Sequence, residues 1–171
     1  YGEADVTNLT NADMQRMFGD VVCASTQPDC TLITAAQIWM EEINRAMHTG
    51  HCEGMAVLSQ YFYYGVLKPQ TFGGETVATL DLAKNIPLQR EIAYWWATQA
   101  TYPTRGHHTT ADANTAIALL RDGLNKKAQI SQLYTLGMYT LDHTDGHTVT
   151  PIALLDIDAT HVAIQIYDNN I

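Results

Sequence analysis

The hydrophobic pattern of this chain changes its period after Lys127, and this change constrains the fold more than any other feature. Before Lys127, apolar residues recur at helical spacing, as in the series from Ala36 to Met47. After it, apolar residues alternate, as in Val162, Ile164 and Ile166. We therefore predict an α+β fold, with helices in the first two-thirds of one domain over residues 1–171 and an antiparallel sheet in the last third.

Capping and breaking residues divide the helical part into segments. We expect a short helix near 11–18 in an otherwise irregular segment 1–33, followed by a helix with Thr34 as its N-cap residue, whose spacing to Gln37 fits a capping box. A central, buried helix follows, from Cys52 to Gly65. Two more helices are expected, one with Pro87 in its first turn and one capped by Thr110 or Asp112. Loops are expected at 66–86 and 102–108, and strands at 132–139, 148–155 and 162–167, with a turn at 156–159.

The charge of the chain excludes several classes of partner. The formal net charge is -9, and Lys126-Lys127 is the only cluster of basic residues. Nucleic acids and anionic membrane surfaces are therefore not expected as partners. No apolar stretch approaches the roughly 20 residues of a spanning helix. A peptide or protein substrate remains, with no cofactor or metal and a monomer as the default state.

Three cysteines indicate one disulfide and one free thiol. Cys23 and Cys30 can close a small loop in a segment with little core of its own, which leaves Cys52 without a partner. A disulfide favours a secreted or otherwise extracytoplasmic setting. The chain begins at Tyr1 rather than Met and shows no signal-peptide pattern, so we expect a processed or trimmed chain.

Cys52 has the features of a nucleophile. It follows a glycine turn at Gly50 and opens the central helix, where unpaired backbone N–H groups and the helix dipole stabilise a thiolate. A thiol nucleophile also needs a base that is oriented by a third group. If the last two strands form a hairpin centred between Ile157 and Asp158, His147 lies opposite Asp168 on one sheet face. His161 then pairs with Leu154 near the turn.

Three short motifs resemble the papain-like cysteine peptidase superfamily, in its bacterial secreted form. They are Gly50-His51-Cys52-Glu53-Gly54-Met55, Gly146-His147 and Tyr167-Asp168-Asn169, and the likeness in layout spans about residues 34–170. The Cys-Gly-Ser-Cys-Trp stretch of papain itself is absent. The resemblance implies that Cys52 is the nucleophile, His147 the base and Asp168 the orienting group, with Asn169 as the alternative for the third role.

The resemblance also implies an oxyanion hole made of the Cys52 backbone N–H and a Gln side chain shortly before it. Ala46 stands six residues before Cys52, so that Gln is missing. Since one oxyanion donor is worth about a hundredfold or more in rate, another side chain should take its place. The candidates are Asn44, His48 and Gln37.

The function predicted from these residues is that of a thiol hydrolase, which cleaves peptide or related amide bonds through an acyl-enzyme on Cys52. Two alternatives keep the same fold: an acyl transferase of the transglutaminase or amidase kind, and a non-catalytic binding domain. A metal site formed by His48, His51 and Cys52, with His147 as a fourth ligand, is a further alternative, although its spacing fits no standard zinc pattern. Asp156 and Asp158 are too irregularly spaced for a calcium loop.

Overall fold

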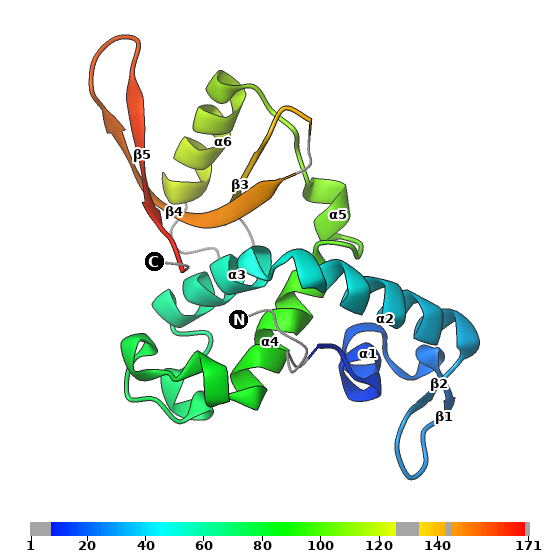
Figure 1. The fold of residues 1–171 in the computed structure, drawn as a ribbon. Helices are drawn as coiled ribbons and strands as arrows, with labels where there is room; N and C mark the ends of the chain where they lie inside the picture. Colours follow the sequence, from blue (N-terminus) through cyan, green and yellow to red (C-terminus); the bar gives the residue numbers. More distant parts are fainter. Residues whose placement is uncertain (1–7, 126–133, 143–144, 170–171) are drawn as a thin grey trace.

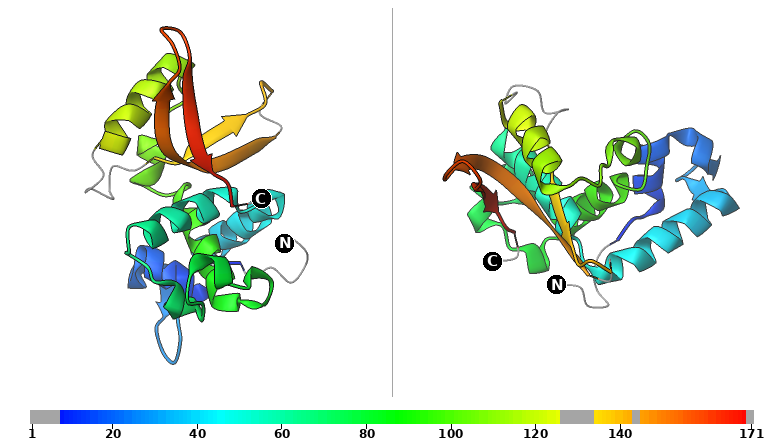
Figure 2. Two further views of the ribbon diagram at one scale, coloured as in Figure 1. Left: turned by 90° about the vertical axis from the view of Figure 1, so that its left-hand side faces the viewer. Right: turned by 90° about the horizontal axis from the view of Figure 1, so that it is seen from above.

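The computed structural model describes residues 8–125, 134–142 and 145–169. It is a mixed α+β structure with two small antiparallel sheets. Figures 1 and 2 show two lobes: a helical lobe that contains α1, α2 and α4, and a lobe formed by α6 and the three-stranded sheet. Helix α3 lies where the two lobes meet, so its side chains can contribute to both.

The N-terminal segment is more structured than the sequence predicts. Helix α1 (Asn11–Phe18) has the predicted bounds, and the Asp13 carboxylate accepts hydrogen bonds from the N–H and hydroxyl of Thr10 at its start. A 3-10 turn, η1 (Asp20–Val22), then leads into the paired strands β1 (Cys23–Ser25) and β2 (Thr31–Leu32), which the sequence analysis did not predict. The predicted Cys23–Cys30 disulfide closes this hairpin.

Helix α2 (Thr34–Ala46) begins one residue earlier than predicted, since Thr34 is its first residue rather than its N-cap, and the predicted capping box is wrong. Ile33 is the N-cap residue, and the Gln37 side chain donates to the Glu41 carboxylate, one turn further along the helix. A 3-10 turn, η2 (Met47–Thr49), follows and ends at Gly50, whose φ of 138° is open to glycine and strained for other residues. Glycine at this position therefore allows the chain to turn from α2 into α3.

Helices α3 (Cys52–Tyr63), α4 (Ile86–Thr98) and α6 (Ala113–Asn125) agree with the predicted segments. The Asn85 side chain caps α4 by accepting from the Leu88 N–H, and Asp112 accepts from the Thr115 N–H at the start of α6. The two predicted loops are partly helical. The first contains the 3-10 turns η3 (Pro69–Phe72), η4 (Val77–Thr79) and η5 (Leu82–Lys84), and the second contains α5 (Thr104–His107).

The larger sheet has the antiparallel order β3-β4-β5. Its strands are β3 (Leu136–Tyr139), β4 (Gly146–Asp156) and β5 (Val162–Tyr167). The predicted beginning of the first strand, at 132–133, lies outside the described residues. Strand β4 begins two residues earlier than predicted, so His147 belongs to the sheet itself.

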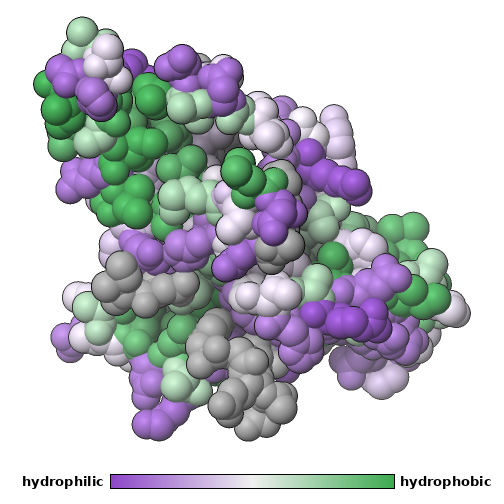
Figure 3. Space-filling view, turned by 45° about the horizontal axis from the view of Figure 1, so that its top comes forward, coloured by the Kyte–Doolittle hydropathy of each residue, from purple (hydrophilic) through white to green (hydrophobic). Residues whose placement is uncertain are grey.

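Two buried clusters lie in the helical lobe. One joins α1, β2, α2 and α4 through residues such as Met14, Leu32, Ala36 and Ala93. The other joins α3 and α4 through Leu58, Leu88 and Ile92. In the sheet lobe, Leu120 and Val149 are buried, but several apolar side chains of the β4–β5 hairpin are exposed, and Figure 3 shows hydrophobic residues gathered there.

In the described part of the chain, no helix combines the length and the hydrophobicity that crossing a bilayer requires.

Candidate active site

Cys52 is the first residue of α3 and is half-buried, with a free thiol. Its N-cap, His51, has a non-helical backbone and makes no side-chain hydrogen bond to the cap position. The N–H groups in the first turn of an α-helix have no acceptor within the helix. The thiol therefore lies at a position where the backbone stabilises negative charge.

His147 and Asp168 form a hydrogen-bonded pair. The distance from His147 Nε2 to Asp168 Oδ2 is 2.9 Å, and the side chains are 33% and 16% exposed. Because the carboxylate accepts the Nε2 hydrogen, the neutral ring carries its lone pair on Nδ1. The pair thus leaves one ring nitrogen available as a base.

The predicted register of the β4–β5 hairpin is wrong. Leu154 pairs with Ile164 and not with His161, and Thr150 pairs with Tyr167, which places Asp168 diagonally from His147 rather than directly opposite it. The register shifts by one residue between Pro151 and Ala153, so Ile152 is the extra residue of a β-bulge. The turn-proximal register alone would place His147 and Asp168 on opposite faces, because a one-residue shift exchanges the faces of a strand. The bulge restores the common face, and the diagonal distance is within reach of a His side chain.

Contacts around Glu53 bring the first turn of α3 to the first residues of β4. The Thr135 hydroxyl donates to both carboxylate oxygens of Glu53, at 3.0 and 3.2 Å, and the Thr148 hydroxyl is a second partner. Glu53 follows Cys52, and Thr148 follows His147. Cys52 and His147 are therefore each adjacent in sequence to one member of the contact between Glu53 and Thr148.

Tyr139 lies at the same end of the sheet. Its ring occupies the space where a Cβ at Gly137 or Gly146 would stand, so both glycines allow the ring to lie flat against the sheet. Burial raises the pKa of the Tyr139 phenol, and the negative charges of Glu53 and Cys52 raise it further. The phenol is thus close enough to Cys52 to sense its charge.

Burial shifts the pKa of the two ionisable groups beside Cys52, Glu53 and His51, in the direction of their neutral forms. Burial raises the pKa of the Glu53 carboxyl, although the Thr135 and Thr148 hydroxyls and the nearby His108 oppose this shift. Burial lowers the pKa of His51, which is 3% exposed, and the positive charge of His48 lowers it further.

The oxyanion-hole candidates occupy different environments. The Asn44 amide binds the N–H and C=O of Leu9, at 3.0 and 3.1 Å, so it holds the N-terminal segment against α2. Gln37 lies in the first turn of α2, and the exposed His48 lies in η2. Asn169 follows Asp168, and its Nδ2 is buried without a hydrogen-bond acceptor in the described residues, which keeps it available as a donor.

Three of the remaining histidines, His107, His108 and His161, are exposed. His161 lies in the β4–β5 turn, where its Nδ1 is 2.9 Å from Asp158. His143 lies outside the described residues. Within the described segments, no three His, Cys, Asp or Glu side chains gather as metal ligands, so the metal site considered above is not formed by His48, His51, Cys52 and His147.

Four residues of this site carry no predicted role in the sequence: Glu53, Thr135, Thr148 and Tyr139. One signal was present, since Glu53 is a carboxylate in the first turn of an otherwise apolar helix. The partners Thr135 and Thr148 carry no such signal because they lie far from Glu53 in the chain.

Comparisons of the chain with protein-family models, with curated proteins and with solved structures find no match.

Proposed function

We propose that this protein is a thiol hydrolase with a papain-like arrangement, which cleaves peptide or related amide bonds through an acyl-enzyme on Cys52. The observation that carries the proposal is the His147–Asp168 hydrogen bond, at the end of the sheet that contacts the first turn of α3 through Glu53. A free thiol at the start of a helix and an oriented imidazole on the adjoining strand are the two parts that nucleophilic catalysis by cysteine requires.

The reaction follows from these positions. His147 Nδ1 accepts the Cys52 thiol proton as the sulfur attacks the carbonyl carbon of the substrate, and Asp168 holds the ring through Nε2. The first-turn N–H groups of α3 stabilise the oxyanion that develops. The imidazolium then protonates the leaving amine as the C–N bond breaks. Water, deprotonated by His147, releases the acyl group and regenerates the thiol.

Covalent labelling with a biotinylated peptide vinyl sulfone, followed by mass spectrometry, tests the proposal. We expect one adduct, on Cys52, and a labelling rate well above that of free N-acetylcysteine. Cys52→Ala should remove the adduct, His147→Ala should slow labelling at least a hundredfold, and Asp168→Ala should have a smaller effect because it misorients the ring without removing it.

His161→Ala is the matched control, because His161 also contacts an aspartate but lies in the exposed hairpin turn. It should leave the labelling rate unchanged. Equal losses for His161→Ala and His147→Ala, or reaction no faster than that of N-acetylcysteine, contradict the proposal. Once a cleaved peptide is found, adding a nucleophilic amine separates hydrolysis from acyl transfer, since only a transferase converts most of the substrate into the amide of the added amine.

A further inference from the structure

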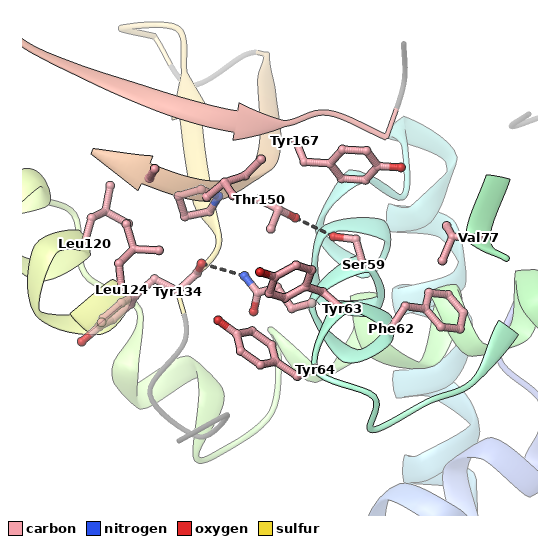
Figure 4. Close-up of a pocket in the computed structure, with 15 residues that line it drawn as sticks. Ser59, Phe62, Tyr63, Tyr64, Val77, Leu120, Leu124, Tyr134, Thr150 and Tyr167 are labelled. Atoms are coloured by element: carbon pink, nitrogen blue, oxygen red, sulfur yellow. Dashed lines mark hydrogen bonds between the residues drawn. The ribbon is translucent and has the colours of Figure 1, made fainter. Parts of the chain in front are cut away.

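A pocket of about 540 Å³ lies at the C-terminal half of α3, between α3, α6 and strands β4 and β5. Its walls are mainly aromatic and aliphatic, and Figure 4 shows the phenol groups of Tyr63 and Tyr64 directed from α3 toward α6 and Tyr134. Leu120 and Leu124 of α6 form the facing wall. The volume is in the range of about 300–1,000 Å³ that is typical of small-molecule sites.

The pocket is separate from the candidate active site. The Ser59 and Thr150 hydroxyls are 2.7 Å apart, and the Thr150 hydroxyl is 3.1 Å from the Ala56 carbonyl oxygen. These contacts lie along α3 between its first turn, which carries Cys52, and its C-terminal half, which lines the pocket. None of the residues of the proposed triad lines the pocket.

The lining determines the charge of a fitting ligand. Among the described residues, none that lines the pocket is charged. Burying an ionised group without a counter-charge is strongly unfavourable, so a charged ligand is excluded from the interior. The ligand must therefore be neutral and mostly apolar.

Besides the tyrosine hydroxyls, the lining offers two side-chain oxygens that can accept a hydrogen bond from a ligand. Both hydroxyl hydrogens of Ser59 and Thr150 are used within their contact with Ala56, which leaves the Ser59 oxygen as an acceptor. Gln60 donates through Nε2 to the Tyr134 carbonyl oxygen at 2.8 Å, and its Oε1 is a second acceptor. An N–H or O–H group of a ligand can be satisfied by these oxygens.

We propose that this pocket binds an uncharged, predominantly apolar small molecule with a hydrogen-bond donor, such as an aromatic amine or an acyl amide. Side chains from α3, α6, β4 and β5 line the pocket, so a small molecule bound there would contact two helices and two strands. The proposal goes beyond the hydrolase function and does not depend on Cys52.

Two fluorescent probes with one skeleton test the proposal. N-phenyl-1-naphthylamine is neutral and has one N–H donor, whereas 1-anilinonaphthalene-8-sulfonate adds a negative charge. We expect saturable binding of the neutral probe at one site and at least tenfold weaker binding of the sulfonate. Equal affinity for the two probes contradicts the inference on charge, and no saturable binding of the neutral probe overturns the proposal.

Substitutions on the β4–β5 hairpin locate the binding site. Ala153→Trp fills the pocket from β4 and should weaken binding of the neutral probe at least tenfold, whereas Ala163→Trp, at an exposed position of β5 outside the pocket, should not. Leu124→Trp fills the pocket from α6 and provides a second test if Ala153→Trp does not fold, as judged by circular dichroism. Unchanged affinity in a folded Ala153→Trp or Leu124→Trp variant refutes the site. Cys52→Ala should bind the probe like the unmodified protein, so the pocket and the hydrolase function can fail separately.

Discussion

Gly54 allows α3 to pack against α4, and replacing it with alanine should destabilise the protein. A Cβ at this position would overlap the Ile92 carbonyl oxygen and lie 2.9 Å from the Trp96 nitrogen, whereas ordinary contact begins at 3.4 Å. Both obstacles are backbone atoms of α4, which cannot rotate away as a side chain can. The two helices must therefore move apart, and the cluster of Leu58, Leu88 and Ile92 between them loses contact.

The magnitude follows from two opposing effects. Glycine to alanine inside a helix is favourable by about 0.8–1.0 kcal/mol through helix propensity alone. Overpacking typically costs about 1–3 kcal/mol, and we take the upper end because the obstacle is backbone. Gly54→Ala should therefore lower the free energy of unfolding by about 2 kcal/mol or more, against total stabilities of about 5–15 kcal/mol.

Urea denaturation followed by circular dichroism measures this change. Gly106→Ala is the control, because the Cβ it adds meets only the Tyr102 ring, 3.2 Å away, and that side chain can move. This variant should stay within about 0.5 kcal/mol of the unmodified protein or gain slightly. If Gly54→Ala unfolds at the same urea concentration as Gly106→Ala, the close approach of α3 and α4 is refuted.

Three further predictions concern single contacts. Asn44→Ala should cost about 1–3 kcal/mol of stability, measured by urea unfolding, because Leu9 loses both backbone partners, while the Cys52 labelling rate of the folded protein should change little. Replacing Cys23 and Cys30 by serine should cost about 2–3 kcal/mol in the same assay, since the disulfide closes a short loop; an unchanged midpoint contradicts this. Burial raises the pKa of Glu53, so its contribution to stability is full below the ordinary Glu pKa of about 4.3 and decreases as the pH rises through the raised value. The melting temperature of Glu53→Gln, relative to that of the unmodified protein, should therefore rise from acid to neutral pH. A difference in melting temperature that does not change with pH would contradict the raised pKa of Glu53.

Local signals allowed much of the fold to be predicted. Helix α1 has the predicted bounds, α2 begins within one residue of its predicted start, α3 begins at Cys52, and the disulfide is the predicted one. Each of these depends on residues close together in the chain, such as the apolar period of a helix or two cysteines seven positions apart. The assigned catalytic roles stay predictions.

The hairpin register could not be derived in the same way. The alternation of β5 is clear in the sequence, but nothing marks Ile152 as an extra residue, and the turn could be centred at more than one position. At the start of β4, the true register differs from the predicted one by two residues. A shift of two residues keeps each side chain on its face of the sheet, so His147 and Asp168 still lie on the same face and form a hydrogen bond. A more regular hairpin would have separated the two side chains.

Contacts between distant segments were also out of reach. Thr135 lies 82 positions from Glu53, and Thr150 lies 91 positions from Ser59. Neither Thr135 nor Thr150 carries a local sequence signal of these contacts. The Glu53 contacts and the pocket depend on how the sheet packs on α3, which periodicity does not determine.

The uneven distribution of the buried clusters has a consequence for local opening of the chain. Both clusters lie in the helical lobe, together with most of α3, whereas the sheet lobe buries fewer apolar side chains and exposes much of its hairpin. Segments with fewer buried contacts open at lower free energy, so amide hydrogens of β4 and β5 should exchange with solvent sooner than those of α3 and α4. Cys52 and His147 then belong to units of different stability, and the pair can come apart while the helix that carries the thiol remains folded.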